Sequence, residues 1–243
     1  MCELCTANAS KPRIARRNFL RLAGITAGLA IAPRAFAKET KAPPKPENVL
    51  SPDAALDRLM KGNTRYIDGL TKRHDFKHER EALSSGQNPF AAVLSCADSR
   101  IAPELCFDTA RGDVFVCRVA GNFANDDIVA SLEYAVAVLN TPLIMVLGHG
   151  ACGAVDATIK SIKDGTTLPG HLPSLVAALR PAVEAVKDKP GDLLANAIRS
   201  NVALTVDKLK SAAPILKSFA DDKKIRIVGG VYALQTGRVE LLS

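Results

Sequence analysis

Three residues of this chain have the types and spacing suited to metal chemistry: Cys96, His149 and Cys152. Two thiolates and one imidazole bind a borderline-soft cation such as Zn²⁺ well. The H-x-x-C spacing lets His149 and Cys152 face one point from a turn, where Gly148 and Gly150 allow the backbone to bend. Three protein ligands leave the fourth coordination position open, which is typical of a catalytic zinc site. The alternative is that both cysteines are buried small hydrophobic residues and that His149 is an ordinary loop residue.

The segments that carry these residues have the pattern of strands in a parallel sheet. Short apolar runs cover residues 90–95, 114–119, 143–147 and 225–229, and residues 238–242 form a candidate edge strand. Continuous apolar runs separated by helical segments predict an α/β fold, with a mostly parallel β-sheet of four to five strands flanked by helices. Chemistry in such sheets collects at the carboxyl ends of the strands. Cys96 and His149, which follow the first and third runs, are therefore expected to meet.

Helix signals lie before and between these runs. Ser51 and Pro52 form a helix start, and Gly62-Asn63 is predicted to end that helix. Residues 128–139 show an apolar stripe at helical spacing, with Asn125 or Asp126 as the cap. Residues 171–217 are also predicted to be helical. Their expected breaks are at Pro181, Pro190-Gly191 and Pro214.

The N-terminus has the pattern of an export signal. Arg16-Arg17-Asn18-Phe19-Leu20 is a twin-arginine motif, residues 22–32 form a short apolar stretch, and Ala35-Phe36-Ala37 is a small-x-small cleavage site. We predict a signal peptide over residues 1–37, cleaved after Ala37, a proline-rich linker over 38–50 and a folded domain over 51–243. The expected location is the periplasm. The alternative is an uncleaved N-terminal anchor.

Most of the net positive charge of the chain lies in this leader. The 243-residue sequence carries a formal net charge of +7, but residues 1–37 contain six of its basic residues and one of its acidic residues. The remaining chain has a net charge of +2, which gives little support for electrostatic capture of nucleic acid. The apolar stretch of the leader is too short for a transmembrane helix, so no stable membrane anchor is expected in the mature protein.

Two segments around the candidate ligands resemble the signature motifs of the β-class carbonic anhydrases. They are Cys96-Ala97-Asp98-Ser99-Arg100 and His149-Gly150-Ala151-Cys152-Gly153. The resemblance covers almost the whole chain after the leader. It also includes the segments 61–63, 86–89, 112–118, 131–136 and 229–232.

The resemblance implies a zinc enzyme that hydrates carbon dioxide reversibly to bicarbonate and a proton. It assigns Cys96, His149 and Cys152 as the ligands of one zinc ion per chain, and Asp98 and Arg100 as the catalytic pair. It further assigns four residues to substrate binding, with two aromatic ones contributed by a neighbouring subunit. These four are Gln87, Phe115, Tyr134 and Gly153. Members of the family form dimers, often paired into tetramers, so a homodimer or tetramer is expected, with the first helix reaching onto the partner.

Two other functions fit the same motifs. The first is hydrolysis of carbonyl sulfide or carbon disulfide, which are linear and isoelectronic with carbon dioxide. The second is a non-catalytic zinc-binding scaffold, although such a protein has no need of Gln87, Asp98 or Arg100. Cys106 and Cys117, the other cysteines beyond the leader, are expected to be free buried thiols, because a domain of this size needs no disulfide.

Overall fold

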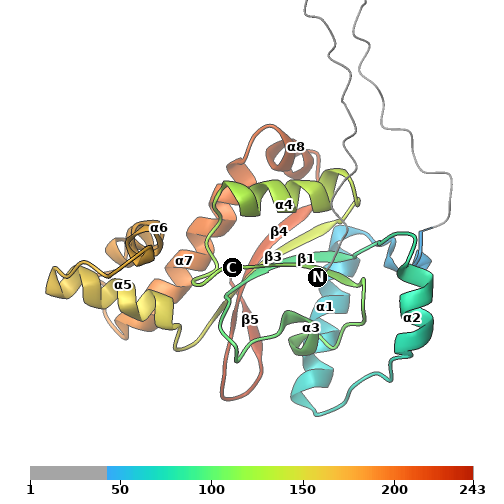
Figure 1. Ribbon diagram of the computed structural model, residues 1–243, viewed down its shortest axis with the longest axis horizontal. Helices are drawn as coiled ribbons and strands as arrows, with labels where there is room; N and C mark the ends of the chain where they lie inside the picture. Colours follow the sequence, from blue (N-terminus) through green and yellow to red (C-terminus); the bar gives the residue numbers. More distant parts are fainter. Residues whose placement is uncertain (1–42, 243) are drawn as a thin grey trace, which may run out of the picture. The chain divides into compact units, whose positions relative to one another are not determined.

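The computed structural model describes residues 43–242. The predicted signal peptide, residues 1–37, and the first part of the predicted linker lie outside the described residues. In the described part, helices separate the four parallel strands along the chain, as the sequence predicts (Figure 1). Within it, no helix is both long enough and apolar enough to cross a membrane.

The sheet has five strands in the order β2-β1-β3-β4-β5. The strands are β1 (Ala91–Ser95), β2 (Val114–Arg118), β3 (Leu143–His149), β4 (Arg226–Tyr232) and β5 (Val239–Leu241). The first four are parallel, and β5 pairs antiparallel with β4 at one edge. Every residue of β1 and β3 is buried, because helices cover both faces of the central strands. The predicted fold class is therefore confirmed.

Different helices cover the two faces of the sheet (Figure 1). On one face, α4 (Asp126–Ala137), α7 (Leu193–Ser211) and α8 (Ile215–Asp221) form an apolar core with alternate strand residues. On the other face, α1 (Pro52–Ile67) and α3 (Pro103–Cys106) form a second core with the remaining strand residues. The short α2 (Phe76–Leu83) buries none of its side chains.

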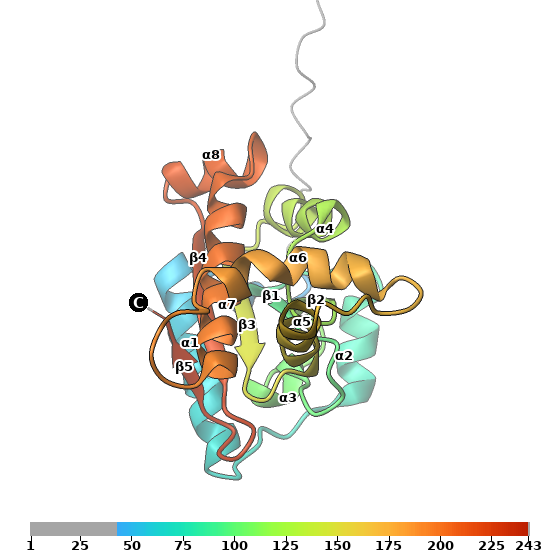
Figure 2. The ribbon, with the colours of Figure 1, turned by 90° about the vertical axis from the view of Figure 1, so that its left-hand side faces the viewer.

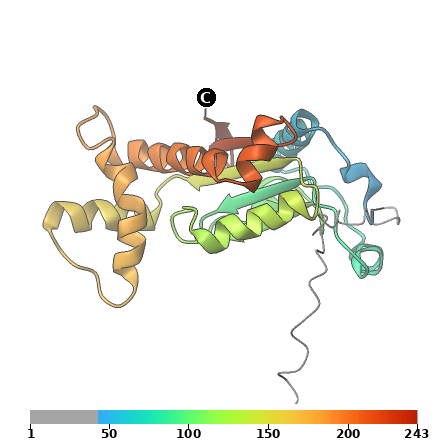
Figure 3. The ribbon, with the colours of Figure 1, turned by 90° about the horizontal axis from the view of Figure 1, so that it is seen from above.

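Two further helices extend beyond the carboxyl ends of the strands. α5 (Gly153–Asp164) and α6 (Leu172–Glu184) pack on each other, and both contact α7. Figure 2 shows them in front of β3, and Figure 3 shows them at the opposite end of the domain from α2. A third apolar cluster lies between these helices and the sheet, and it includes Cys96 and Cys152. The candidate ligands are therefore enclosed by this helical extension.

The first helix starts as predicted but ends later. The side chain of Ser51 accepts a hydrogen bond from the backbone N–H of Ala54, and the helix continues through Gly62-Asn63 to Ile67. A Cβ atom at position 62 would lie 1.8 Å from the carbonyl oxygen of Phe107, so Gly62 allows a close contact between α1 and the loop after α3. The prediction of a helix end at this point is wrong, because that glycine serves packing.

The proline at position 181 also departs from expectation. The sequence predicts a break there, but Pro181 lies inside α6, which runs unbroken from Leu172 to Glu184. The other breaks are confirmed, since α6, α7 and α8 are separate helices. The cap of α4 is Asn125, whose side chain accepts a hydrogen bond from the N–H of Ile128.

The later part of the predicted linker belongs to the folded domain. A short 3-10 helix covers Pro46–Asn48, and Asn48 is buried. The Nζ atom of Lys45 lies 2.8 Å from Oδ1 of Asp113, and Nδ2 of Asn48 donates to that same oxygen at 3.1 Å. The composition of this segment suggests an extended linker, but these long-range polar contacts attach it to the loop before β2.

Candidate metal centre

The three candidate ligands meet at the carboxyl edge of the sheet. Cys96 follows β1, His149 is the last residue of β3, and Cys152 is the N-cap residue of α5. Their Sγ and ring nitrogen atoms all lie within 4.8 Å of one another, and all three residues are buried. The parallel pairing of β1 with β3 brings Cys96 to residues that follow it by more than fifty positions.

The ring of His149 is oriented for a ligand. Its Nδ1 atom lies 2.8 Å from the carbonyl oxygen of Gly150. Because a carbonyl can only accept a hydrogen bond, Nδ1 donates to it, and Nε2 is the ring nitrogen that faces the two cysteines and is available to a ligand. Nε2 is buried and has no hydrogen-bond partner among the described residues. A buried polar atom without a partner is costly, and a metal ion is the partner that this donor set suits.

The two neighbouring thiols have pKa values that are shifted in opposite directions. A hydrogen bond from Cys152 lowers the pKa of Cys96 despite its burial, and the N–H of Gly121, which lies 3.3 Å from Sγ of Cys96, acts in the same direction. The neighbouring Cys96 raises the pKa of Cys152, and burial adds to this effect. Two cysteine sulfurs beside an imidazole nitrogen are the donor set of a zinc site. The residues present therefore fit Zn²⁺.

Asp98 and Arg100 form a two-pronged ion pair beside the cluster. Nε of Arg100 donates to Oδ1 of Asp98 at 2.9 Å, and Nη2 donates to Oδ2 at 2.7 Å. These hydrogen bonds from Arg100 hold the pKa of the Asp98 carboxyl well below its usual range. Oδ2 also lies 3.9 Å from Nε2 of His149. The centre therefore has an ionised carboxylate next to the position that a metal ion would take.

Arg118, the last residue of β2, is a site residue to which the sequence analysis assigned no role. Its guanidinium donates to three backbone carbonyls of the loop after β1: those of Cys96 at 3.0 Å, Asp98 at 2.7 Å and Ile101 at 2.9 Å. One side chain thus holds the loop that carries a candidate ligand and the ion pair. A single cationic residue within the apolar run 114–119 was the available signal.

The structure separates the predicted substrate-binding residues into two groups. Gly153 is exposed and directly follows Cys152, so it lies at the centre. Gln87 precedes β1, whereas Cys96 follows it, so a strand of about 16 Å separates them. Phe115 pairs in register with Ala92 near the start of β1, and its ring lies 6.4 Å from that of the half-exposed Tyr134. Within one chain, these three residues do not reach the centre.

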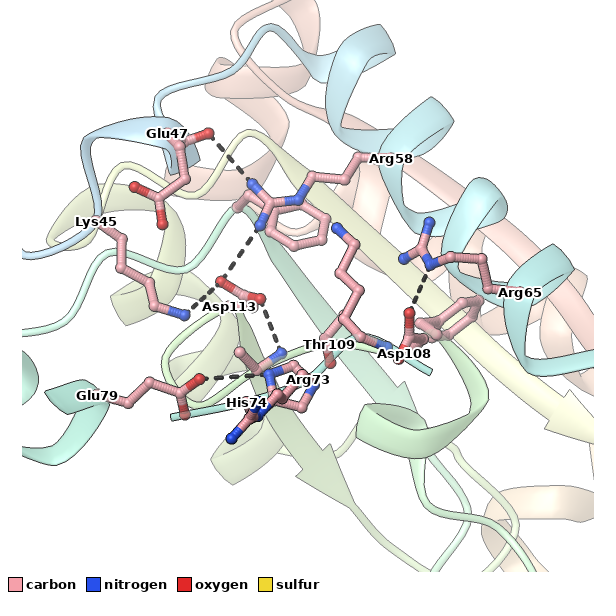
Figure 4. Close-up of a pocket in the computed structure, with 14 residues that line it drawn as sticks. Lys45, Glu47, Arg58, Arg65, Arg73, His74, Glu79, Asp108, Thr109 and Asp113 are labelled. Atoms are coloured by element: carbon pink, nitrogen blue, oxygen red, sulfur yellow. Dashed lines mark hydrogen bonds and ion pairs between the residues drawn. The ribbon is translucent and has the colours of Figure 1, made fainter. Parts of the chain in front are cut away.

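A separate cavity lies near the amino ends of the strands. It has a volume of about 390 Å³ and is lined mainly by charged side chains of α1, the loop before α2 and the loops before β1 and β2 (Figure 4). Its buried carboxylates are paired: Arg65 lies 2.5 Å from Asp108, and Lys45 and Arg58 lie 2.8 and 3.4 Å from Asp113. The charged side chains that line the cavity thus form an ion-pair network, which joins the segment before α1 to the domain.

All four cysteines in the described part of the chain are buried and free. They are Cys96, Cys106, Cys117 and Cys152. Burial is the main cause that raises the pKa of Cys106, to about 11, and also that of Cys117. These two thiols are therefore free and protonated at neutral pH, as the sequence analysis expected.

Comparison with known proteins gives one consistent family. Residues 91–239 match the protein family described as carbonic anhydrase. Carbonic anhydrase 2 of Mycobacterium tuberculosis is 36% identical over 192 residues, which cover 79% of this chain and 93% of that protein. A carbonic anhydrase of Mycolicibacterium smegmatis is 36% identical over 194 residues, which cover 79% of this chain and 94% of that protein.

Solved structures agree with the sequence relatives. The β-carbonic anhydrase CcaA superposes with a TM-score of 0.60 at 26% identity, covering 77% of this chain and 95% of that one. A structure from a study of two tetrameric β-carbonic anhydrases of Sordaria macrospora has the same fold, with a TM-score of 0.61 at 22% identity over 78% of this chain and 98% of that one. With its Cys–His–Cys centre and its Asp98–Arg100 pair, this chain belongs to the β-class carbonic anhydrase family.

Proposed function

We propose that this protein catalyses the zinc-dependent, reversible hydration of carbon dioxide to bicarbonate and a proton. The observation that carries the proposal is the buried Nε2 of His149, which has no hydrogen-bond partner in the described part of the chain, is enclosed with two cysteine sulfurs and lies 3.9 Å from the carboxylate of Asp98. Cys96, His149 and Cys152 would hold the ion. When bound, zinc acidifies a water molecule so that hydroxide becomes available near neutral pH.

Asp98 orients the reacting water in this proposal. Because Arg100 keeps the pKa of Asp98 low, the carboxylate stays ionised and is a poor proton acceptor at neutral pH. It accepts a hydrogen bond from the water and thereby turns an oxygen lone pair toward carbon dioxide. Arg118 supports this geometry, because it fixes the backbone carbonyl of Asp98. Substrate binding is weak by nature, since carbon dioxide is uncharged and apolar.

A second copy of the chain is proposed to complete the substrate pocket. Gln87, Phe115 and Tyr134 do not reach the centre of their own chain, and β2, which carries Phe115, is an edge strand with half-buried apolar side chains. We expect a homodimer, or a tetramer of two dimers, in which these residues face the partner's centre. Sedimentation analysis of the purified protein tests this arrangement. A fully active monomer would contradict it.

The activity itself is tested by a stopped-flow carbon dioxide hydration assay on zinc-loaded protein, with carbonyl sulfide and carbon disulfide assayed in parallel. We expect hydration to be the fastest of the three reactions and to be lost when a chelator removes zinc. Faster turnover of either sulfur compound would identify a hydrolase instead. No turnover of any substrate by protein with full zinc content would indicate a scaffold.

Export by the twin-arginine route is a separate proposal, supported by Arg16-Arg17 and by the small residues Ala35 and Ala37. The mature protein is expected to begin at Lys38 and to be periplasmic. Replacing both arginines by lysine should leave the precursor in the cytoplasm, which cell fractionation and N-terminal sequencing would detect. Unchanged export of that double variant would overturn this proposal without affecting the enzymatic one.

A further inference from the structure

The turn between the candidate ligands His149 and Cys152 contains an unusual backbone conformation. Ala151 has a φ of +50°, in the left-handed region that residues with a Cβ atom rarely adopt. Gly150 directly precedes Ala151 and Gly153 follows it by two positions, and neither glycine has a positive φ. The unfavourable conformation thus occurs at the alanine, although glycine, which adopts it without cost, is the preceding residue. Such outliers persist where the surrounding structure requires them.

The left-handed turn places the carbonyl of Ala151 against the catalytic ion pair. Nη2 of Arg100 donates to that carbonyl oxygen at 3.1 Å and to Oδ2 of Asp98 at 2.7 Å. One nitrogen therefore joins the turn after β3 to the carboxylate of the loop after β1. The turn is itself attached to β4, because the N–H of Gly150 donates to the carbonyl of Tyr232 at 2.9 Å.

The ion pair needs such an anchor. The side chain of Arg100 is 52% exposed, and an exposed arginine–carboxylate pair restrains its members weakly. The carbonyl of Ala151 gives Arg100 an additional hydrogen-bond acceptor. Its position is defined because the turn that carries it is attached to β4. The Asp98 carboxylate is then held from two sides, by Arg118 through its backbone and by Arg100 through its side chain.

We infer that Ala151 is a positioning residue: its left-handed conformation directs a carbonyl that fixes Arg100, and through Arg100 the carboxylate of Asp98, beside the metal centre. The catalytic consequence rests on the proposed function. The structural consequence does not, because it concerns only where the guanidinium lies. Replacement by a β-branched residue, which tolerates a positive φ least, should turn the carbonyl away and release Arg100.

The first test compares Ala151→Val with Ala151→Gly. We expect Ala151→Val to lower kcat about 10-fold with KM nearly unchanged, as for the loss of an orienting group, while zinc content stays at one ion per chain. Ala151→Gly should keep most of the wild-type kcat, because glycine adopts the left-handed conformation freely. An unchanged kcat in Ala151→Val would overturn the inference. Loss of zinc from that variant would also overturn it, because the turn would then act on the ligands.

A double-mutant cycle with Arg100→Gln tests whether Ala151 acts through Arg100. If it does, adding Ala151→Val to Arg100→Gln should change kcat by less than about twofold, because the interaction is already absent. A further 10-fold fall in the double variant would show an independent effect and would overturn the inference.

Lys223→Val provides the matched control. Lys223 has a φ of +56° in the exposed turn between α8 and β4, remote from the ligands along the sheet. Introducing the same β-branched residue at another position with a positive φ should lower Tm but leave kcat per zinc unchanged. If Lys223→Val lowered kcat as Ala151→Val does, the effect would be one of general stability, and the inference would fail.

Crystal structures of the wild type and Ala151→Val give a readout that does not depend on activity. We expect Nη2 of Arg100 to remain within hydrogen-bond distance of the residue 151 carbonyl in the wild type and to move away from it in the variant. An unmoved guanidinium would overturn the inference even if the protein had no hydration activity. Absence of activity in the zinc-loaded wild type would instead overturn the proposed function.

Discussion

Ionisable side chains cluster at both ends of the parallel sheet, but the two clusters differ in how their members are paired. At the carboxyl end, Nε2 of His149 is buried without a partner among the described residues, beside two free thiols. At the amino end, the buried carboxylates of Asp108 and Asp113 are each paired with arginine or lysine (Figure 4). Glu79 keeps one oxygen without a partner there, but its other oxygen lies 3.3 Å from His74.

This difference separates a site whose donor atoms suit a metal ion from a network that holds the chain together. The buried aspartates that line the charged cavity have cationic partners, so these charges stabilise the packing of the segment before α1. The Cys–His–Cys centre instead combines a buried ring nitrogen, without a partner among the described residues, with two cysteine sulfurs, and this donor set suits Zn²⁺. The chemistry of the grouped donors thus identifies the functional end.

The largest effect is expected from Cys152→Ser. A neutral hydroxyl would replace a thiolate ligand, so zinc content should fall from one ion per chain to nearly none, and hydration activity should fall with it. Atomic emission spectroscopy and stopped-flow assays measure both quantities. Full zinc occupancy in this variant would contradict the comparison, because the carboxyl end of the sheet would then not hold the metal site.

Asp98→Ala is expected to have the next largest effect on activity. The variant should keep its zinc but lose about 10- to 100-fold in kcat, since the group that orients the reacting water is gone. Metal analysis alongside kinetics distinguishes this result from loss of the ion. An Asp98→Ala variant as active as the wild type would show that the ion pair with Arg100 is only structural.

Asp113→Asn probes the opposite end and should affect stability instead. Breaking a buried ion pair should lower the free energy of unfolding by about 3 kcal/mol, and so lower Tm by ~6–12 °C, while kcat per zinc stays unchanged. Calorimetry and kinetics on the same sample check this separation. A fall in kcat per zinc would show that the amino end of the sheet also affects catalysis, and it would contradict the comparison.

The pH dependence of that stability has a defined sign. Burial works to raise the pKa of Asp113, but Lys45, the N–H of Ala110 and Asn48 outweigh it, and the pKa lies below the ordinary value of 3.8. The contribution of Asp113 is therefore fully present above that value and is lost as pH falls through the lower pKa of the folded state. The difference in stability between wild type and Asp113→Asn should accordingly shrink below about pH 4.

Lys45→Met should have the smallest effect. It removes one partner of Asp113 but leaves Asn48, Arg58 and the N–H of Ala110 in contact with that carboxylate. We expect a loss of about 1 kcal/mol in the free energy of unfolding, measured by thermal unfolding. A loss as large as that of Asp113→Asn would show that Lys45 alone compensates the buried charge.

The sequence by itself determined the sheet and the set of candidate metal ligands. Runs such as 143–147 and the spacing of His149 and Cys152 are local patterns, and local patterns specify strands, turns and the side chains at their ends. The parallel order of the sheet then brings Cys96 beside them. The motif around Asp98 and Arg100 followed from the resemblance to the carbonic anhydrases, and the structure confirms that the two side chains pair.

Only the tertiary structure decided which residues support those patterns. Gly62 has the local signature of a helix end, yet the approach of Phe107 requires it inside α1. The neighbouring Asn63 donates to the carbonyls of Cys106 and Gly237, which lies 174 positions away in the sequence. The guanidinium of Arg118 and the attachment of Lys45 to Asp113 likewise depend on distant partners. The physical reason is common to all of these: sequence patterns report a residue's own conformation and burial, whereas its hydrogen-bond partners exist only once the chain is folded.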